Sequence, residues 1–342
     1  MTHRLLRVAA LGAIAATATS DARAQLPSDT LAIREWTVPY PASRPRDPSV
    51  APDGRVWFAG QATNYVAVLD PRTGAFRKYD IPAGADPHTV VVDAQGTPWY
   101  TGNHNQTIGR LDPATGKVTE IKLPDPARDP HTMVFDGRGH LWFTVQGGNV
   151  VGRLTIATSE VTLIAVPTAR ARPYGIVLDA SGRPWIDLFG SNKLATVDPA
   201  TLVLEEIELP DAKSRPRRIA LTSDGRVWWG DYTQGKLGVY DPKSKKISEY
   251  PMPGGLASLP YALTVDDNDR LWYVETGPQP NRFVGFDPKT NRFFGATTVP
   301  SGGGSIRHME YDRKTKQIWF GSDNNTVGRA AVPPARTGRE TT

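Results

Sequence analysis

The sequence predicts an all-β, single-domain fold, a seven-bladed β-propeller of four-stranded blades. Three observations support this prediction: a tryptophan recurs at a nearly constant interval, turn residues recur around it, and no stretch shows helical periodicity. The intervals between the repeated tryptophans are 42, 43, 43, 43, 44 and 47 residues. These residues are Trp57, Trp99, Trp142, Trp185, Trp228, Trp272 and Trp319. A repeat of this length, with its Gly and Pro turns, has room for four short strands.

The first two strands of each repeat are predicted on either side of an Asp-x-x-Gly turn. The first strand opens at a proline and continues in a β-branched run such as Val90–Val92, and a turn such as Asp93–Gly96 leads into the tryptophan strand. The prolines stand twelve residues before six of the tryptophans, at Pro45, Pro87, Pro130, Pro173, Pro216 and Pro260. The aspartates stand six residues before four of them, at Asp93, Asp136, Asp179 and Asp266.

The third and fourth strands are predicted around a second recurring turn, Asp-Pro-x-Thr-Gly. In the second repeat the third strand is Ile108–Asp112, the turn is Asp112–Gly116, and the fourth strand is Thr119–Pro124. Related turns occur at Asp70–Gly74 and Asp198–Thr201. Because the tryptophans and turns recur around the whole predicted ring, we interpret them as structural and assign them no chemistry.

The position of the fourth strands predicts how the ring closes. Six fourth strands end in a proline, at Pro82, Pro124, Pro167, Pro210, Pro253 and Pro300. The seventh copy of this ending lies at the front of the chain, in Arg34–Pro39. We therefore expect the N-terminal strand to complete the last blade, which ties the ring together and protects its edges.

Both ends of the chain are expected to lie outside the propeller, which we place at residues 25–332. Residues 1–24 have the layout of a cleaved secretory signal: Arg4 and Arg7, the apolar run Val8–Thr19, and the small-x-small site Ala22–Ala24. The apolar run is too short to span a bilayer. We expect an exported, periplasmic protein without a transmembrane segment, and a flexible tail over residues 333–342.

Composition narrows the expected partners. The chain has no cysteine, so it uses no disulfides, and its size is sufficient to build a core without them. The formal net charge is +5, and the Lys and Arg residues are scattered, which disfavours a nucleic-acid partner. We expect a monomer that binds a small molecule.

Propeller topology indicates which face carries the function. The turns between the first two strands and between the last two are uniform, whereas the connections at the opposite face are longer and variable, which is typical of functional loops. Two rings of side chains are expected at this variable face. The first ring follows the strand-opening position and comprises Arg46, His88, His131, Tyr174, Arg217, Tyr261 and Arg307. The second, at the ends of the tryptophan strands, comprises Gly60, Gln61, Asn103, His104, Gln146, Phe189, Asp231, Tyr232, Glu275, Ser322 and Asp323.

The functional interpretation of these rings is a polar pocket for an anionic or carbonyl-bearing ligand, with groups suited to acid–base chemistry. The structural alternative is a ring of salt bridges, in which Asp231 and Glu275 neutralise Arg217, Arg218 and Arg307.

The repeat frame resembles the virginiamycin B lyase (streptogramin lyase) family. The motif is Pro-x-x-[Ile/Val], Asp-x-x-Gly-x-[Leu/Val]-Trp-[Phe/Tyr], Ile-Gly-Arg-Leu-Asp-Pro-x-Thr-Gly and Leu-Pro, and Asp129–Leu154 is especially similar to it. The resemblance extends from about Glu35 to Arg329. It implies a seven-bladed propeller and a lyase that opens a cyclic ester by elimination with a magnesium ion.

The resemblance also implies a site: a Glu three residues after a blade tryptophan, a His two residues further on, and a His at the corresponding place in the preceding blade. Glu275 matches the Glu. Gly277 and Thr233 stand where the two histidines would be, and His104 is the only His at that offset from a repeated tryptophan.

Three functions stay open from the sequence. The first is a lyase-like enzyme, with Glu275, His131 and His88 as catalytic residues. Its substrate-binding residues would be His104, Tyr174, Arg217, Asp231, Tyr261 and Arg307. The second is a periplasmic binding propeller without chemistry. The third is a calcium-dependent lactonase, with Asp231, Glu275 and Asn103 as oxygen donors.

Overall fold

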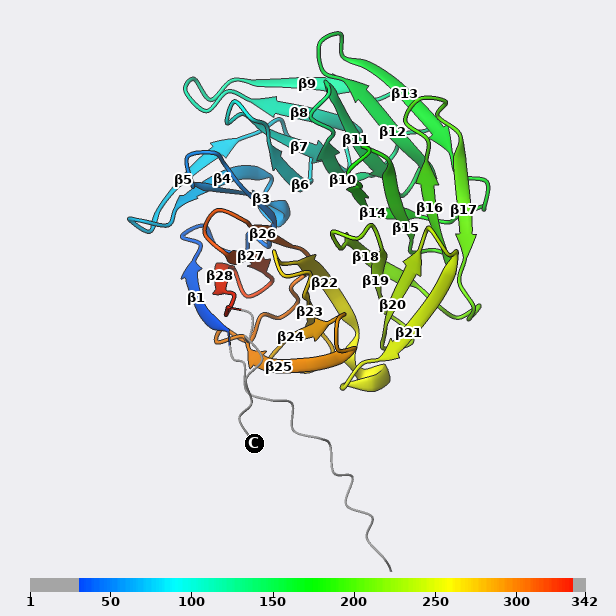
Figure 1. Cartoon of the computed structure of the whole chain (residues 1–342). Helices are drawn as coiled ribbons and strands as arrows, with labels where there is room; N and C mark the ends of the chain where they lie inside the picture. Colours follow the sequence, from blue (N-terminus) through cyan, green and yellow to red (C-terminus); the bar gives the residue numbers. More distant parts are fainter. Residues whose placement is uncertain (1–30, 335–342) are drawn as a thin grey trace, which may run out of the picture.

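The computed structural model describes residues 31–334 and consists almost entirely of β-strands. Seven four-stranded antiparallel sheets are arranged as blades around a central channel (Figure 1). The described residues contain two 3₁₀ turns, η1 (Gln61–Thr63) and η2 (Gly255–Ser258), and no helix long and apolar enough to cross a membrane. The predicted fold class is confirmed.

The strands occupy four positions in each blade, from the channel outward. The innermost strands are β2 (Pro45–Val50), β6 (Pro87–Val92), β10 (Pro130–Phe135), β14 (Pro173–Leu178), β18 (Pro216–Leu221), β22 (Pro260–Val265) and β26 (Met309–Asp312). The second strands are β3 (Val56–Gly60), β7 (Pro98–Gly102), β11 (His140–Val145), β15 (Pro184–Leu188), β19 (Val227–Asp231), β23 (Leu271–Glu275) and β27 (Gln317–Ser322).

The outer two positions complete the blades. The third strands are β4 (Tyr65–Asp70), β8 (Thr107–Leu111), β12 (Val150–Thr155), β16 (Lys193–Val197), β20 (Lys236–Asp241), β24 (Arg282–Asp287) and β28 (Thr326–Ala331). The outermost strands are β5 (Ala75–Asp80), β9 (Val118–Lys122), β13 (Glu160–Ala165), β17 (Leu204–Glu208), β21 (Lys246–Pro251), β25 (Arg292–Thr298) and β1 (Ala32–Thr37). Blades 1 to 6 are contiguous in sequence, and blade 7 contains β26, β27, β28 and β1.

The N-terminal strand closes the ring, as the sequence predicts. β1 pairs with β28 in an antiparallel register from Ala32 opposite Ala331 to Thr37 opposite Thr326. The Glu35 carboxylate fixes this register further, because it accepts hydrogen bonds from Thr326 Oγ1 at 2.7 Å and from Ser301 N at 2.8 Å. The expected signal at 1–24 lies outside the described residues, as does the expected tail from residue 335 onward.

The repeated tryptophans lie in the apolar layers between blades. Trp57 of β3, for example, packs in one cluster with Val90 and Tyr100 of the next blade. The Asp six residues earlier has a defined partner: in blade 2, Asp93 Oδ2 accepts a hydrogen bond from Trp99 Nε1 at 3.0 Å, while its Oδ1 accepts from backbone N–H groups of its own turn. The recurrent Asp and Trp are therefore structural, which explains why the motif repeats.

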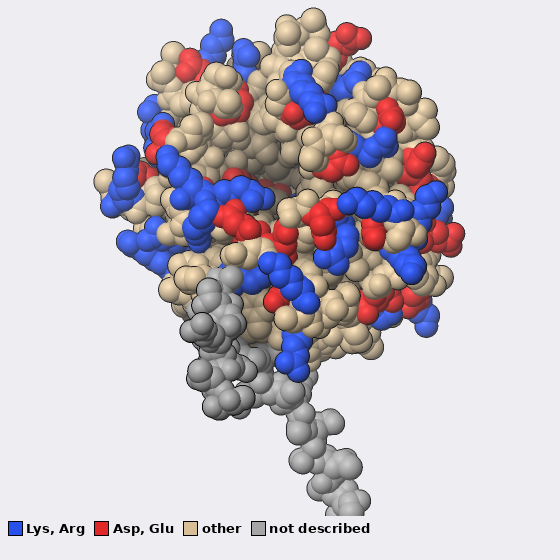
Figure 2. All heavy atoms as spheres, viewed as in Figure 1, with Lys and Arg blue, Asp and Glu red and all other residues tan. Residues whose placement is uncertain are grey.

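A β-bulge recurs in the innermost strands and decides what faces the channel. The pairing between the first and second strands shifts register in blades 1 to 6, just after the opening proline. A bulge inserts an extra residue and re-aims neighbouring side chains. Asp47 of β2 and Arg218 of β18 directly follow Arg46 and Arg217 of the predicted first ring. Both have positive φ, of 36° and 64°, where the chain departs from the extended conformation of a strand. Figure 2 shows the central hollow, with basic and acidic side chains intermixed over the face drawn.

Candidate functional site

The first predicted ring of side chains lies together around the channel. We call Arg46, His88, His131, Tyr174, Arg217, Tyr261 and Arg307 the mouth ring; each of the first six directly follows the proline that opens an innermost strand. Proline lacks an N–H and is tolerated at the first residue of a strand. In blades 1 to 6 the opening proline is therefore followed by one side chain at an equivalent depth in the channel.

Contacts run from blade to blade along one half of the mouth ring. Arg46 Nη2 lies 2.5 Å from His88 Nε2. The ring centroids of His88 and His131 are 3.6 Å apart, and those of His131 and Tyr174 are 4.0 Å apart. Four residues from blades 1 to 4 therefore form one continuous polar and aromatic row.

The other half of the mouth ring joins this row through hydroxyl and cation contacts. The hydroxyl groups of Tyr174 and Tyr261 are hydrogen-bonded to each other. The Arg217 guanidinium lies over the Tyr261 ring, 3.5 Å from its centroid. Arg307 forms an ion pair with Asp323, a residue of the predicted second ring.

The mouth ring is closely packed and shielded from solvent. His88, His131, Tyr174 and Tyr261 are at most 4% exposed, whereas Arg217 and Arg307 are partly exposed. Electrostatic interactions are stronger in such a water-poor environment. An approaching ligand therefore meets the two arginines first and the histidines and tyrosines behind them.

Both histidines of the mouth ring are neutral at pH 7. Burial and the charge of Arg46 lower the pKa of His88 well below its usual value, and burial and the neighbouring His88 do the same for the pKa of His131. Because Arg46 can only donate, Nε2 of His88 accepts, and its Nδ1 donates to Thr89 Oγ1 at 3.1 Å. His131 Nδ1 is hydrogen-bonded to Thr132 Oγ1 at 2.9 Å, and its Nε2 has no partner within residues 31–334.

The two tyrosines differ in acidity. Burial raises the pKa of Tyr261 above its usual value. Burial acts in the same direction on Tyr174, but the charges of Arg217 and Arg218 outweigh it and lower the pKa of Tyr174. Tyr261 is thus the donor in the hydroxyl pair, and Tyr174 is the group that releases a proton more readily.

Arg217 lies among four aromatic rings. Besides Tyr261, its guanidinium carbon lies 4.4 Å from the Tyr232 centroid, 4.5 Å from that of Phe189 and 5.3 Å from that of Tyr174. Phe189 and Tyr232 belong to the predicted second ring, so the two rings meet here. Cation–π contacts hold the guanidinium in place without neutralising its charge, which leaves it able to attract an anion.

Glu275 lies at the end of β23, away from the contacts of the mouth ring. Its side chain is fully buried, and both carboxylate oxygens are engaged. Oε2 accepts two hydrogen bonds from Arg282, which stands opposite it in β24, and Oε1 accepts from Gly254 N at 3.1 Å. Glu275 therefore links the end of β23 to the loop that precedes η2.

Asp231 and His104 also lie apart from the row of contacts. Asp231 is fully buried, and its Oδ1 accepts hydrogen bonds from the backbone N–H groups of Arg215, Thr233 and Gln234. The His104 side chain is 76% exposed, with Nε2 3.4 Å from Asp86 Oδ2. Of the predicted site residues, the structure therefore brings together His88, His131, Tyr174, Arg217 and Tyr261, while Arg307 pairs with Asp323.

The described residues around Glu275 do not fit the magnesium ion that the family resemblance implies. The Glu275 oxygens are already bonded to Arg282 and Gly254, and Gly277 supplies no side-chain donor. Within residues 31–334 there is no group of three or more His, Cys, Asp or Glu that could hold a metal ion. The same observation applies to the calcium set of Asp231, Glu275 and Asn103.

The structural alternative, a ring of salt bridges in which Asp231 and Glu275 neutralise the arginines, is wrong, because Arg218 and Arg307 pair with other carboxylates. Arg218 pairs with Asp47 at 3.0 Å, not with Asp231 or Glu275. Arg307 pairs with Asp323, and the Glu275 partner is Arg282. The actual pairs follow from strand register and from the recurrent bulges.

Directly behind the mouth ring lies a buried polar layer that sequence analysis did not predict. We call Asp47, Thr89, Thr132 and Arg218 the inner layer. Arg218 donates to Asp47 Oδ2 and to Thr132 Oγ1, both at 3.0 Å, and Thr89 Oγ1 donates to Asp47 Oδ2 at 2.9 Å. The layer links blades 1, 2, 3 and 5 across the channel.

The inner layer was not predicted because side chains on a regular strand alternate between its two faces. Each of its members directly follows a mouth-ring residue, so alternation would turn it away from the channel. The bulges place two successive residues toward the channel instead. The only sequence signal is that the residue after each mouth-ring position is polar in five of seven blades, at Asp47, Thr89, Thr132, Arg218 and His308.

Comparisons with known proteins give a consistent family. A model described as the virginiamycin B lyase family matches residues 8–282. A solved streptogramin B lyase structure is similar with a TM-score of 0.80 and 25% identity, covering 89% of this chain and 98% of that one. No curated protein sequence matches the chain.

Two further solved structures share the fold at lower identity. One is a catalytically inactive virginiamycin B lyase from Staphylococcus aureus with quinupristin, at TM-score 0.80 and 22% identity, covering 89% of this chain and 100% of that one. The other is described as the extracellular domain of a hybrid two-component system from B. thetaiotaomicron, at TM-score 0.68 and 16% identity, covering 92% of this chain and 44% of that one.

Proposed function

The chain belongs to the virginiamycin B lyase family, and from this membership we propose that its mouth ring binds a carbonyl-bearing ester and cleaves it by elimination. The observation that carries the proposal is the unpartnered Nε2 of His131, which lies in a buried row beside Tyr174 and behind two partly exposed arginines. Elimination needs a base for a carbon-bound proton and positive charge for the developing enolate, and these residues offer both.

In the proposed reaction, His131 is in the tautomer whose Nδ1–H donates to Thr132 Oγ1, and its Nε2 takes the proton from the carbon next to the substrate carbonyl. The electron pair of that C–H bond forms a carbon–carbon double bond as the neighbouring C–O bond breaks, and the leaving oxygen keeps the C–O electrons. Arg217 and Arg307 would face the carbonyl oxygen, where negative charge develops. The neutral state of His131 at pH 7 suits it to accept a proton.

Tyr174 is the proposed hydrogen-bond donor to the leaving oxygen, which departs as a carboxylate and keeps its negative charge. Arg217 and Arg218 lower the pKa of Tyr174, and its hydroxyl accepts a hydrogen bond from Tyr261, so its O–H group is a stronger donor. His88 holds His131 by packing against it at 3.6 Å between ring centroids. We assign His88 a positioning role, because its own ring nitrogens are engaged by Arg46 and Thr89.

The test is a turnover screen of cyclic depsipeptides, lactones and uronate esters, with mass spectrometry to detect an unsaturated product, which has unchanged mass where a ring is opened and appears with the released leaving group where the substrate is open-chain. We expect His131→Ala to lower kcat on a cleaved substrate by about 100-fold or more. His140→Ala is the matched control, because His140 starts β11 at the far end of the blade and pairs with Asp136. Full turnover by His131→Ala, or a hydrolytic product in place of the unsaturated one, would overturn the proposal.

A second candidate function is ligand binding without chemistry. The tight packing of the mouth ring favours it, since His131 is 1% exposed and a substrate must displace neighbours to reach it. A ligand from the screen that raises Tm with no turnover, and whose effect depends on Arg217, would support this function.

We further propose that the protein is exported and that residues 1–24 are removed. The support is the layout of those residues in the sequence, with Arg4 and Arg7 before an apolar run and a small-x-small site before Gln25. Intact-mass analysis of the protein from periplasmic and cytoplasmic fractions tests this. Mature protein beginning at Gln25 in the periplasmic fraction is the expected result.

A further inference from the structure

The channel holds a cavity on the side of the inner layer that faces away from the mouth ring. Its volume is about 290 Å³, and we call it the turn-side cavity because it lies toward the turns that join the first and second strands. Thr132 lines its end nearer the mouth ring and, through its bond to Arg218, belongs to the inner layer. The inner layer thus separates this cavity from the mouth ring.

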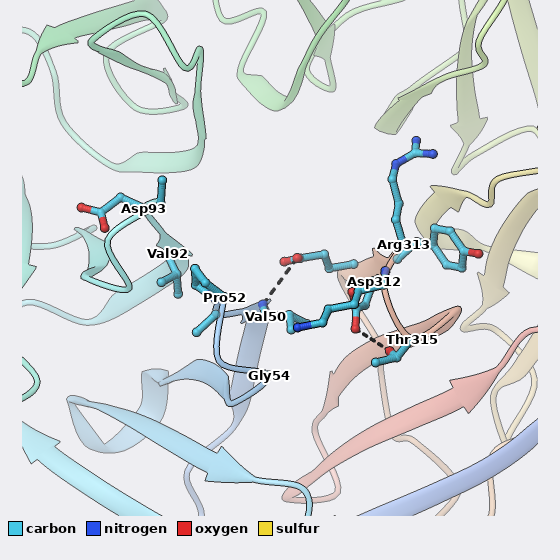
Figure 3. A pocket seen from close by; sticks show the side chains of 13 residues that line it. Val50, Pro52, Gly54, Val92, Asp93, Asp312, Arg313 and Thr315 are labelled. Carbon is cyan, nitrogen blue, oxygen red and sulfur yellow. Dashed lines mark hydrogen bonds between the residues drawn. The ribbon is translucent and has the colours of Figure 1, made fainter.

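A neighbouring cavity connects Glu310 with the outside of the ring. It has a volume of about 400 Å³ and lies at the turns of blades 7, 1 and 2; Figure 3 shows it between Pro52, Asp93 and Asp312. Val92 and Glu310 line both cavities, so the Glu310 side chain stands at their junction. A small molecule entering from the turns would pass this carboxylate.

Glu310 is a carboxylate without a cation. Within the described chain its oxygens form no ion pair; they accept a long hydrogen bond from Val50 N at 3.4 Å and one from the Ser49 side chain. Burial raises its pKa to about 7. Arg313 and Lys314 line the neighbouring cavity with Glu310; Arg313 pairs with Asp267, and within residues 31–334 no ion pair joins Lys314 to Glu310. Glu310 is partly buried, and a carboxylate withdrawn from water is stabilised by a paired cation, which a cationic ligand would provide.

The rest of the turn-side cavity is suited to a hydrocarbon group. Val92, Val134, Phe135 and Ile176 contribute apolar wall. The cavity offers one further unused polar atom: His308 also lines it, and its Nδ1 is buried and has no partner within the described chain. Burial lowers the pKa of His308 to about 4, so its ring is neutral and can accept a hydrogen bond.

We propose that the turn-side cavity is a second ligand site, separate from the mouth ring, which binds a small primary ammonium ion carried on an apolar body. Glu310 is the counter-ion, His308 Nδ1 is a further acceptor for an N–H group, and the valine and isoleucine wall packs against the hydrocarbon. A divalent metal ion does not fit this cavity, since Ca²⁺ and Mg²⁺ need about six oxygen ligands and a single carboxylate lines it. The cavity volume lies at the small end of known ligand pockets, which limits the ligand to a compact molecule.

Calorimetry of the intact protein with cyclohexylamine tests the proposal, with cyclohexanol and cyclohexanecarboxylate as probes of equal size. We expect cyclohexylamine to bind at least tenfold more tightly than either. Glu310→Gln should weaken binding by tenfold or more, while the exposed control Glu160→Gln on β13 should not change it. Equal affinity for the alcohol, no heat from millimolar cyclohexylamine, or unchanged binding by Glu310→Gln would each overturn the proposal.

A variant that fills the cavity separates binding from folding. Val134→Phe should fill the cavity and abolish binding while Glu310 is retained, with Tm as the check that the variant folds.

Binding should also tighten from pH 6 to pH 8 as Glu310 loses its proton, because an alkylamine stays charged to about pH 10. The charged or titratable groups near Glu310 from the elements around it are His308, Tyr311, Asp312, Arg313, Lys314 and Asp93. A His131→Ala variant that binds cyclohexylamine normally would show that this site is independent of the proposed lyase reaction.

Discussion

The guanidinium of Arg218 in β18 donates a hydrogen bond to Oδ2 of Asp47 in β2 at 3.0 Å, and each residue is 2% exposed. The two strands belong to blades 5 and 1, so the ion pair crosses the channel and links parts of the chain 171 residues apart. Burial alone would raise the pKa of Asp47, but the neighbouring basic groups, Arg218 foremost among them, together outweigh burial and hold it well below its usual value.

Removing one partner of this pair should be strongly destabilising. Arg218→Met removes the nearer cation of the buried Asp47 and leaves only Arg46, whose Nε lies 3.7 Å from Asp47 Oδ1, and we expect a loss of about 3–5 kcal/mol in the free energy of unfolding, measured in urea. Arg226→Met is the control, because Arg226 pairs with the half-exposed Asp224 and should cost less than about 1 kcal/mol. The double variant Arg218→Met with Asp47→Asn should be more stable than Arg218→Met alone. A loss below about 1 kcal/mol for the single variant would contradict this account.

Asp187 in β15 should make the protein less stable as the pH rises. Burial raises its pKa to about 8, whereas an unfolded Asp titrates near 4. Between these values the folded state binds more protons than the unfolded state, so the free energy of unfolding falls with increasing pH. Asp187→Asn keeps the neutral form and can still accept the hydrogen bond that Gly175 N gives at 3.1 Å.

We therefore expect Asp187→Asn to be more stable than the parent protein at pH 8 and close to it at pH 4. Urea unfolding at pH 4, 6 and 8 measures the difference. The exposed Asp80→Asn serves as the matched substitution and should leave the slope of stability against pH as it is. The explanation fails if Asp187→Asn and the parent protein lose stability in parallel across this range.

The hydroxyl pair at the mouth ring predicts a tyrosine that titrates early. In the parent protein the pKa of Tyr174 lies below its usual value because of Arg217 and Arg218, helped by the hydrogen bond from Tyr261. Tyr261→Phe removes that bond and should move the titration of Tyr174 to higher pH, followed by ultraviolet absorbance. Tyr311→Phe should not move it, since burial raises the pKa of Tyr311 to about 12. An unchanged early titration in Tyr261→Phe would be evidence against the pairing.

Glu275 is predicted to support folding and not turnover. Glu275→Ala leaves Gly254 N and Arg282 without their acceptor, and we expect a loss of about 1–3 kcal/mol in urea unfolding. Activity per folded molecule should stay within about twofold of the parent on any substrate found. The exposed Glu208→Ala should cost less than about 0.5 kcal/mol. A 100-fold loss of activity with normal stability would instead assign Glu275 to the reaction.

The architecture was readable from sequence because its determinants are local. Turns, opening prolines and tryptophans recur from blade to blade, and the position after the proline predicted six side chains that contact one another in the mouth ring. The ion pair between Glu275 and Arg282 was not predicted, although the two residues lie opposite each other in adjacent strands of one hairpin. The pair of Asp47 and Arg218 could not be predicted, because bulges reverse the alternation and the partners lie in distant blades.

The closure of blade 7 has a consequence for the timing of folding during synthesis. β1 leaves the ribosome first, but its partner β28 is made after all other strands, since Ala32 pairs with Ala331. Blades 1 to 6 can complete their sheets as they emerge, whereas β1 must wait with an open edge for nearly the whole time of translation. An exposed edge is the part of a sheet most prone to pair with a wrong partner. The interval before the last strand emerges is therefore when this chain is most exposed to aggregation.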